Sequence, residues 1–457
     1  MPFNPIVFIV AAVGGYMLLR LRFFFIIHPV RTGSYLLRTV GRRDTARSLF
    51  LALGGTLGVG NIFGVAVGLI LGGAGSVFWM LVSSVFAAVL KYSEVTLSSD
   101  ALTHTAGGKH GGMFRIIRDG FGRLGGALSV VYAAATLLVA FSMGAALQTH
   151  TFVAAAGEIF DTPPTLSAAL YAFLVLLTVV GGAKIIERVN EILIPLTTII
   201  YISLALVILV IYRERLPAAL GEIFRSALLP RAAGGGVVGF LTSRAVSEGF
   251  ARGLLSNEAG SGTSSMAHAR GGELNPAMSG LMGIVEVIFD TVILCTLTAL
   301  VLLVSVPDVG AYSEGMDLAL AGFVHALGRG GGGLLAACIL AFSYSTVTCW
   351  YFYGCEAYSA IFGSSRPVVM LPLYLCAIVL GARAPSGVLV FVTDTLLLVM
   401  TAITGAVIIK SSDRIVHLSE RGGVLTRRGI NIRLFRGVKS AKRRPRVKLN
   451  CNQPQKR

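Results

Sequence analysis

Residues 53–64 read LGGTLGVGNIFG and interrupt an apolar run, from about residue 48 to residue 71, that is long enough to cross a lipid bilayer. Five glycines fall within this short stretch, and each costs about 1 kcal/mol in a helix interior relative to alanine. In hydrocarbon, unwound backbone persists only where it is buried in protein or lines a cavity. The stretch therefore predicts a broken membrane helix whose free amides and carbonyls could bind a ligand. Close helix packing through small residues is the alternative.

The composition indicates a polytopic membrane protein. Of the 457 residues, 54% are hydrophobic and only 13% are charged, and the mean hydropathy is +0.78. The apolar runs are too long for barrel strands, so the predicted fold class is an all-α bundle of about 11 transmembrane helices. The predicted spans are residues 4–25, 46–71, 74–98, 127–156, 165–182, 189–212, 236–265, 277–305, 333–362, 367–382 and 386–409.

Basic residues predict the orientation of the chain. The segment 20–47 contains seven arginines and one acidic residue, and residues 410–457 contain 15 Lys or Arg and two acidic residues. Both segments are expected on the cytoplasmic side, which places the N-terminus outside. The expected location is the plasma membrane, in bacteria the inner membrane. The basic tail could contact anionic lipid, and no nucleic acid partner is expected.

A second interrupted run covers residues 249–265, which read GFARGLLSNEAGSGTSS. Two glycine-broken helices at matching places in two halves are the pattern of a secondary transporter's binding site. The predicted organisation is an N-terminal extra helix and basic loop (1–44), a first five-helix repeat (45–212), an exterior amphipathic connection (213–235), a second five-helix repeat (236–410) and a basic tail (411–457). The two repeats would be inverted relative to each other.

Several polar side chains lie inside these spans. Glu258 follows the second break, where it could contact a ligand, form part of a gate or be solvated. Glu248 and Arg252 are four residues apart, so they can pair on one helix face as a structural or gating contact. Glu286 and Asp290 have the same spacing, and packing or a cytoplasmic gate is favoured over ion binding for them.

The stretch 341–354, AFSYSTVTCWYFYG, offers a second set of ligands. Ser345 and Thr346 supply adjacent hydroxyls, and Trp350 lies one turn beyond Thr346. Hydroxyls and carbonyls freed by a broken partner helix suit sodium, which is a hard cation. The alternative is that the hydroxyls bond to carbonyls of their own helix. Gln148 is a lone amide in its span, equally suited to helix packing and to ligand contact.

With these motifs in view, the chain resembles the sodium:alanine (alanine or glycine:cation) symporter family. The similarity runs from about residue 20 to residue 411 and is carried by GVGNIFGVAVGLILGGAGSVFWM, ARGLLSNEAGSG, IFDTVILCTLTALV and STVTCWYFYG. The resemblance implies the five-plus-five inverted repeat of the bacterial leucine transporter with one extra N-terminal helix. It also implies symport of a small neutral amino acid, alanine or glycine, with sodium as the co-transported ion.

The resemblance also implies roles for individual residues. The substrate-binding residues would be Thr56, Val59, Gly60, Asn61, Gln148, Leu255, Thr346 and Trp350. The sodium ligands would be carbonyls of Gly54, Leu57 and Phe342 with hydroxyls of Ser345 and Thr346. Where the family usually has Phe, Gly and Glu, this chain has Leu255, Cys349 and Cys355, so its pocket wall differs from that of its relatives.

The expected protein is thus a sodium-coupled transporter in the lipid bilayer, with Glu248, Arg252 and Glu258 as gating candidates. No catalytic residues and no organic cofactor are expected, and the protein is not expected to be an enzyme. A proton-coupled carrier of the same fold remains the nearest alternative, in which a carboxylate such as Glu258 would be neutralised. A membrane-embedded enzyme is the alternative from another class, with Glu286 and Asp290 as its only candidate dyad.

Overall fold

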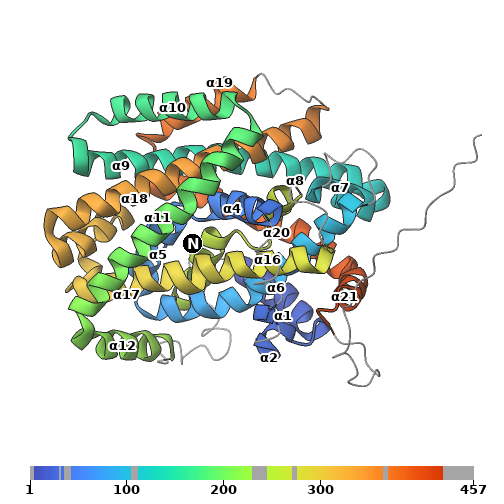
Figure 1. Ribbon diagram of the computed structural model, residues 1–457, viewed down its shortest axis with the longest axis horizontal. Coiled ribbons are helices and arrows are strands. Elements are labelled where there is room, and N and C mark those ends of the chain that lie inside the picture. The colour runs from blue at the N-terminus through green and yellow to red at the C-terminus, as the bar shows by residue number, and fades with distance from the viewer. Residues whose placement is uncertain are drawn as a thin grey trace, which may run out of the picture. The chain divides into compact units, whose positions relative to one another are not determined.

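The computed structural model describes residues 5–29, 32–34, 43–103, 112–228, 244–269, 275–363 and 369–425. For residues 43–46 and 102–103 it describes the backbone alone. Every regular element in these ranges is helical, as predicted (Figure 1). Some predicted features lie outside the described residues. They are the tail beyond residue 425, residues 35–42 of the arginine-rich segment 20–47, and residues 236–243 at the start of the predicted 236–265 span.

The first predicted repeat contains one bent span followed by four further helical segments. They are α4 (Arg43–Thr56) with α5 (Phe63–Gly72), α6 (Gly75–Thr103), α8 (Gly125–Val139) continuing through the π-helical η3 (Ala140–Leu147) into α9 (Gln148–Phe160), α10 (Pro164–Val180) and α11 (Ala183–Ile211).

The second predicted repeat follows the same plan after the predicted amphipathic connection, which contains the helix α12 (Leu216–Leu228). Its segments are α14 (Arg244–Asn257) with α15 (Ser264–His268), α16 (Pro276–Val287) continuing through the π-helical η6 (Ile288–Cys295) into α17 (Thr296–Ser305), α18 (Gly315–Phe362), α19 (Met370–Gly381) and α20 (Ser386–Lys410).

Among the described residues, α1 (Ile6–Arg20), the short α2 (Phe24–Ile27) and α21 (Ser412–Arg421) also lie outside the two predicted repeats, and α7 (Met113–Gly120) lies between α6 and α8 of the first. Helix α1 packs on α6 and α20, and Arg20 at its end pairs with Asp413 at the start of α21. The extra N-terminal helix therefore lies against both predicted repeats.

Among the described residues, six helices are long and apolar enough to cross a membrane, and the bent pair α4–α5 makes a seventh. Helices α1, α10 and α19 are apolar but shorter. Helix α18 begins well before the predicted run at residue 333. Its first part is a separate helix, because the chain turns at Gly328, where φ is +67° and glycine is the residue that adopts this conformation readily.

Close helix contacts at the centre depend on glycines. Helix α6 packs against both α14 and α16. A Cβ atom added at Gly249 of α14 would lie 2.5 Å from the Ser76 carbonyl oxygen, and one added at Gly283 of α16 would lie 2.9 Å from the Lys91 carbonyl oxygen. Small residues let backbones approach in this way in membrane proteins, where packing rather than the hydrophobic effect holds helices together.

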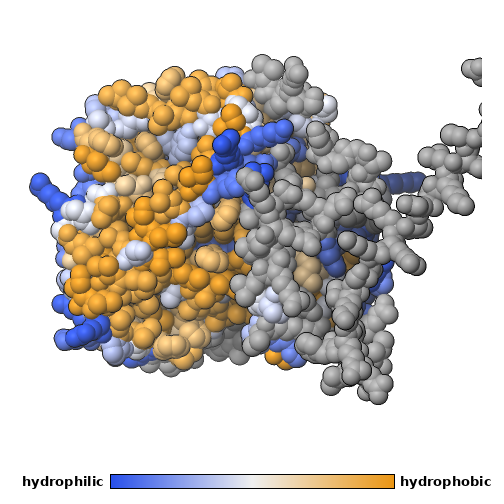
Figure 2. Space-filling model, viewed as in Figure 1, coloured by the Kyte–Doolittle hydropathy of each residue, from blue (hydrophilic) through white to orange (hydrophobic). Residues whose placement is uncertain are grey.

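Large apolar side chains remain on the outside of the bundle. Helices α10 and α11 alone expose Leu170, Phe173, Ile192, Leu196 and Ile199. Figure 2 shows a broad hydrophobic surface over the part of the molecule where α11 runs. In water such a surface would be a liability, whereas in a bilayer it is the expected contact with lipid tails.

The central packing makes a testable prediction. Substituting Gly283→Ala places a methyl group against immobile backbone of α6, so we expect unfolding in detergent at a lower temperature, equivalent to about 1–3 kcal/mol. Gly157→Ala is the matched control, because its Cβ would meet no atom within 4 Å and alanine is the better helix former. Equal thermal stability of the two variants would contradict this packing.

Candidate functional site

The first candidate feature is the break between α4 and α5. The two helices are bent by 58° relative to each other, and Val59–Asn61 form a short 3-10 segment, η1, between them. Gly58 lies immediately before η1, against the side chains of α9 and α18. An added Cβ there would lie 2.5 Å from Thr346 Oγ1 and 3.3 Å from Gln148 Nε2. Unwound backbone at this point therefore faces polar side chains rather than lipid.

The second break, residues 258–263, separates α14 from α15. Glu258, Gly260 and Gly262 all have positive φ, at 54°, 85° and 80°. Side chains replace the missing helical hydrogen bonds. Asn257 Oδ1 accepts a hydrogen bond from the Ala259 amide at 2.9 Å, and Tyr132 Oη donates to the Ser261 carbonyl at 2.6 Å. The break is thus a supported structure and not a frayed helix end.

The first break touches the last turn of α14, just before the second break. A Cβ atom at Gly60 would lie 2.9 Å from Ser256 Cα, so only glycine allows this approach. Asn61 Nδ2 donates to Asp290 Oδ1 at 2.8 Å, and Ser256 Oγ donates to Asp290 Oδ2 at 2.8 Å. The Asp290 carboxylate of η6 therefore links the first break to the end of α14, which agrees with a packing role, and its predicted role in a cytoplasmic gate stays a prediction.

Oxygen atoms converge at the end of α4. Ser345 Oγ and Thr346 Oγ1 of α18 donate to the Gly54 carbonyl at 3.2 and 3.1 Å. Asn190 of α11, which the sequence reasoning missed, donates from Nδ2 to the Ile186 carbonyl. Its Oδ1 is thereby turned toward Ser345, with which it forms a hydrogen bond. Gly54, Ser345 and Thr346 are brought together as predicted.

The remaining predicted cation ligands lie in the same buried region. Leu57 ends α4 and is 1% exposed, and Phe342 precedes Ser345 by one turn on α18 and is 2% exposed. That their carbonyls bind an ion stays a prediction. The oxygens of this cluster are buried and uncharged, a combination that suits a monovalent cation after it has lost its water.

Trp350, one of the predicted substrate contacts, follows Thr346 by one turn on α18. Trp350 is fully buried and packs on Gly144 of η3, where any Cβ would collide with it. Trp350 Nε1 donates to Glu258 Oε1 at 3.1 Å, and Glu258 Oε2 accepts from Thr263 Oγ1 at 2.7 Å. Glu258 is therefore a buried and hydrogen-bonded group, which rules out the solvated alternative.

Other predicted substrate residues are placed less directly. Val59 and Leu255 are buried at the two breaks, with Leu255 Cδ2 3.9 Å from the Cβ position of Gly64. Gln148 Oε1 is buried and has no hydrogen-bond partner. Thr56 directs its hydroxyl to the Ala52 and Leu53 carbonyls of its own helix, at 3.3 and 3.4 Å. Its predicted contact with substrate would need that hydroxyl to turn.

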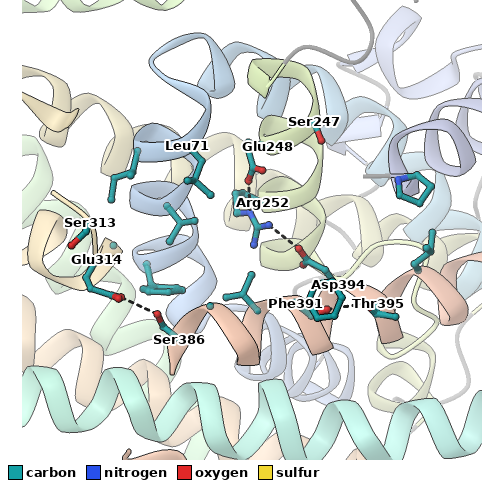
Figure 3. A pocket seen from close by; sticks show the side chains of 18 residues that line it. Leu71, Ser247, Glu248, Arg252, Ser313, Glu314, Ser386, Phe391, Asp394 and Thr395 are labelled. Atoms are coloured by element: carbon teal, nitrogen blue, oxygen red, sulfur yellow. Dashed lines mark hydrogen bonds and ion pairs between the residues drawn. The ribbon is translucent and has the colours of Figure 1, made fainter. Parts of the chain in front are cut away.

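A cavity of about 550 Å³ lies on one side of the breaks, between α5, α14, α20 and the start of α18 (Figure 3). Arg252 lines this cavity. Its Nε pairs with Glu248 Oε2 at 3.2 Å, as predicted from the sequence, and its Nη2 pairs with Asp394 Oδ2 of α20 at 2.7 Å. Asp394 was missed, although a lone acid in an apolar span is itself a signal. The arginine ties α14 to α20 across the cavity.

A second charged cluster joins α6, α15 and α16. Lys91 Nζ donates to Glu286 Oε2 at 3.0 Å and to Ser264, and the other Glu286 oxygen pairs with His268. All four side chains are buried. Buried charges are tolerated in this setting because each has a partner of opposite sign. The packing or gating role predicted for Glu286 agrees with this position.

Comparisons with known proteins identify the class. The structure resembles MhsT in complex with L-phenylalanine, with a TM-score of 0.61 at 15% identity, covering 84% of this chain and 94% of that one. At this identity the similarity shows the fold alone. The chain thus shares its all-helical fold with MhsT.

The particular family follows from the sequence comparisons. The model of the sodium:alanine symporter family matches residues 3–419, and the chain belongs to that family. The Sodium/alanine symporter AgcS of Methanococcus maripaludis is 32% identical over 77% of this chain and 78% of its own length. The Uncharacterized transporter YflA of Bacillus subtilis is 31% identical over 83% of this chain and 82% of its own length.

The hydrogen bond between Trp350 and Glu258 makes a prediction. Glu258→Ala leaves a buried indole N–H without an acceptor, so we expect a loss of about 1.5–3 kcal/mol in stability and a shifted Trp350 emission. Glu258→Gln keeps an acceptor at the same place and should change both much less. Trp79→Phe provides the background, because the chain has two tryptophans. Identical spectra for the two Glu258 variants would refute the contact.

Proposed function

We propose that the protein is a secondary active transporter that carries a small neutral amino acid, alanine or glycine, into the cell together with sodium. The observation that supports this most is the convergence of Ser345 and Thr346 hydroxyls on the Gly54 carbonyl beside an unwound helix. Sodium would bind among these oxygens and the carbonyls of Leu57 and Phe342. Family membership and the sodium/alanine relative support the same assignment.

The substrate would bind next to the ion, between the two breaks. Backbone amides of Val59 and Gly60, with Asn61, would hold the carboxylate, since unwound helix ends present free N–H groups. Gln148 Oε1 is an acceptor without a donor, which the substrate ammonium could supply. Leu255 and Trp350 would enclose the side chain. Trp350 is held in place by its packing on Gly144 and its hydrogen bond to Glu258. The pocket therefore cannot enlarge on the Trp350 side, which favours alanine or glycine over larger substrates.

Two charged clusters would control access to this site. The Arg252 pairs with Glu248 and Asp394 would close the cavity side, which we place outside the cell, and the Lys91, His268 and Glu286 cluster would close the cytoplasmic side. Alternating access would then rock one group of helices against the other. A cation entering down 100 mV supplies about 2.3 kcal/mol, or roughly 50-fold accumulation, before any chemical gradient.

The proposed setting is the bacterial inner membrane, with the N-terminus outside and the basic tail 411–457 in the cytoplasm near anionic lipid. A proton-coupled carrier of the same fold is the second candidate. It is favoured by Glu258, a carboxylate that is 1% exposed and lies within the second break.

Uptake of labelled alanine into proteoliposomes tests the proposal. We expect accumulation driven by an inward sodium gradient, and in Thr346→Ala the sodium concentration for half-maximal uptake should rise about tenfold or more, as expected when one ligand worth about 1.4 kcal/mol is lost. Thr348→Ala is the matched control, because its hydroxyl bonds to the Ser345 carbonyl within α18 and should leave sodium dependence unchanged.

Two results of this uptake experiment would contradict sodium coupling. One is equal accumulation from a proton gradient in sodium-free buffer, which would favour the Glu258 alternative. The other is an unchanged sodium requirement in Thr346→Ala, which would remove the Gly54 oxygen cluster from the ion site.

A further inference from the structure

A basic corner, formed by Arg118, Arg123 and Lys410, lies where α7 turns into α8. The short 3-10 segment η2 (Gly122–Leu124) makes the turn and carries Arg123. Helix α20 packs on both α7 and α8 (Figure 1). Its last residue, Lys410, places Nζ 4.8 Å from the centre of the Phe121 ring, where a cation is attracted to the ring face. Cations from two distant parts of the sequence therefore meet at one corner.

The backbone of this corner is fixed by close contacts. A Cβ atom at Gly125 would lie 2.1 Å from the Arg118 carbonyl oxygen, so only glycine allows α7 to fold back onto α8. Ser129 Oγ of α8 donates to the Phe114 carbonyl of α7 at 2.9 Å. Gly122 has a φ of +54°, which glycine adopts readily. A rigid arrangement loses less entropy when a ligand binds to it.

The positive charge of the corner is not balanced by the acid within it. Asp119 contacts Arg115 at 3.2 Å and Arg118 at 3.6 Å. Within the described part of the chain, neither Arg123 nor Lys410 forms an ion pair, and both are exposed. Four cationic side chains thus share one carboxylate. The remaining positive charge can be balanced by an anion from outside the chain.

Exposed apolar side chains begin directly beside these cations. Leu124, which follows Arg123, is 69% exposed, and Ile409, which precedes Lys410, is 47% exposed. Val131, two turns further along α8, is 48% exposed. A free phosphate ion would contact the basic side chains alone. A phospholipid presents a phosphate and then acyl chains, in the order in which the basic and apolar residues follow one another along α8.

We propose that Arg123 and Lys410, with Arg118 beside them, bind the headgroup of an anionic phospholipid whose acyl chains lie along the exposed face of α8. Net charge selects the lipid, because phosphatidylcholine carries a cationic group that offsets its phosphate, whereas phosphatidylglycerol does not. The site is separate from the basic tail beyond residue 425. It goes beyond the proposed function and does not depend on which solute is carried.

A bound headgroup would have a mechanical consequence. Arg123 belongs to the turn between α7 and α8, and Lys410 belongs to the end of α20. One phosphate that contacts both side chains would hold α20 against the corner and reduce the repulsion between the two cations. Binding should therefore stabilise the folded protein, since a ligand that binds only the folded state raises its stability.

The test uses the purified full-length protein in a neutral detergent. Its thermal unfolding midpoint is measured as phosphatidylglycerol is added to the micelles in increasing mole fraction. We expect a saturable rise in the midpoint with phosphatidylglycerol, and no such rise with phosphatidylcholine or with inorganic phosphate. Arg123→Gln and Lys410→Gln should each increase the mole fraction for half-maximal effect about fivefold, and the double variant about 25-fold.

Two further variants serve as controls. Arg225→Gln combined with Arg383→Gln removes the same amount of charge from exposed positions outside the corner, and should leave the phosphatidylglycerol response unchanged. Leu124→Ser keeps the charge of the corner and removes an apolar contact, so it should increase the half-maximal mole fraction about threefold or more. All five substituted side chains are exposed, so none of the changes disturbs the packed interior.

Three results would overturn the lipid site. They are an unchanged phosphatidylglycerol response in the Arg123→Gln and Lys410→Gln double variant, equal stabilisation by phosphatidylcholine, and equal stabilisation by inorganic phosphate. The last would show that the corner binds an anion without its acyl chains. No arm of this test measures uptake. A native protein that fails to accumulate alanine on a sodium gradient would refute the proposed function and leave the lipid result as it stands.

Discussion

Backbone amides and carbonyls that leave a helix inside a membrane must find partners within the protein, since lipid supplies none. This chain breaks two helices, at residues 57–62 and 258–263, and the rest of the structure is arranged to support them. Asn257 and Tyr132 hold the second break, while Ser345 and Thr346 hold the Gly54 carbonyl at the first. In the proposed function, a ligand would bind at these breaks, whose backbone is held out of the helical conformation by the same contacts.

Gly60 and Asp290 explain why the first break lies against the end of α14. Gly60 allows the first break to approach Ser256 at the end of α14, and Asp290 accepts hydrogen bonds from Asn61 of the first break and from Ser256. Arg252 and Lys91 each anchor a charged cluster on either side of this centre. In the proposed transport cycle, a movement of one group of helices against the other would have to break or exchange these ion pairs.

Much of this arrangement could be predicted from the sequence, because glycine runs and hydroxyl residues within apolar spans are local signals. The two breaks and the Glu248 and Arg252 pair follow from such signals and are confirmed. The contact of Ser345 and Thr346 with Gly54 agrees with the set of residues that the family resemblance implied, and its role in ion binding stays a prediction. Asn190, Asp394 and the bridging role of Asp290 could not be predicted in this way. Each depends on which helices become neighbours, which no local spacing encodes. The helical part before Gly328 lies outside the predicted run 333–362 and was missed.

Hydrogen–deuterium exchange measures the central claim directly, because it reports on the unwound backbone itself. Sodium and alanine together should slow exchange in peptides covering residues 53–64 and 254–265, and by more than either ligand alone. A peptide covering α12, residues 216–228, should not change and serves as the internal reference. Protection that appears equally in choline, or that leaves both breaks unchanged, would show that the broken helices are not the ion-coupled binding site.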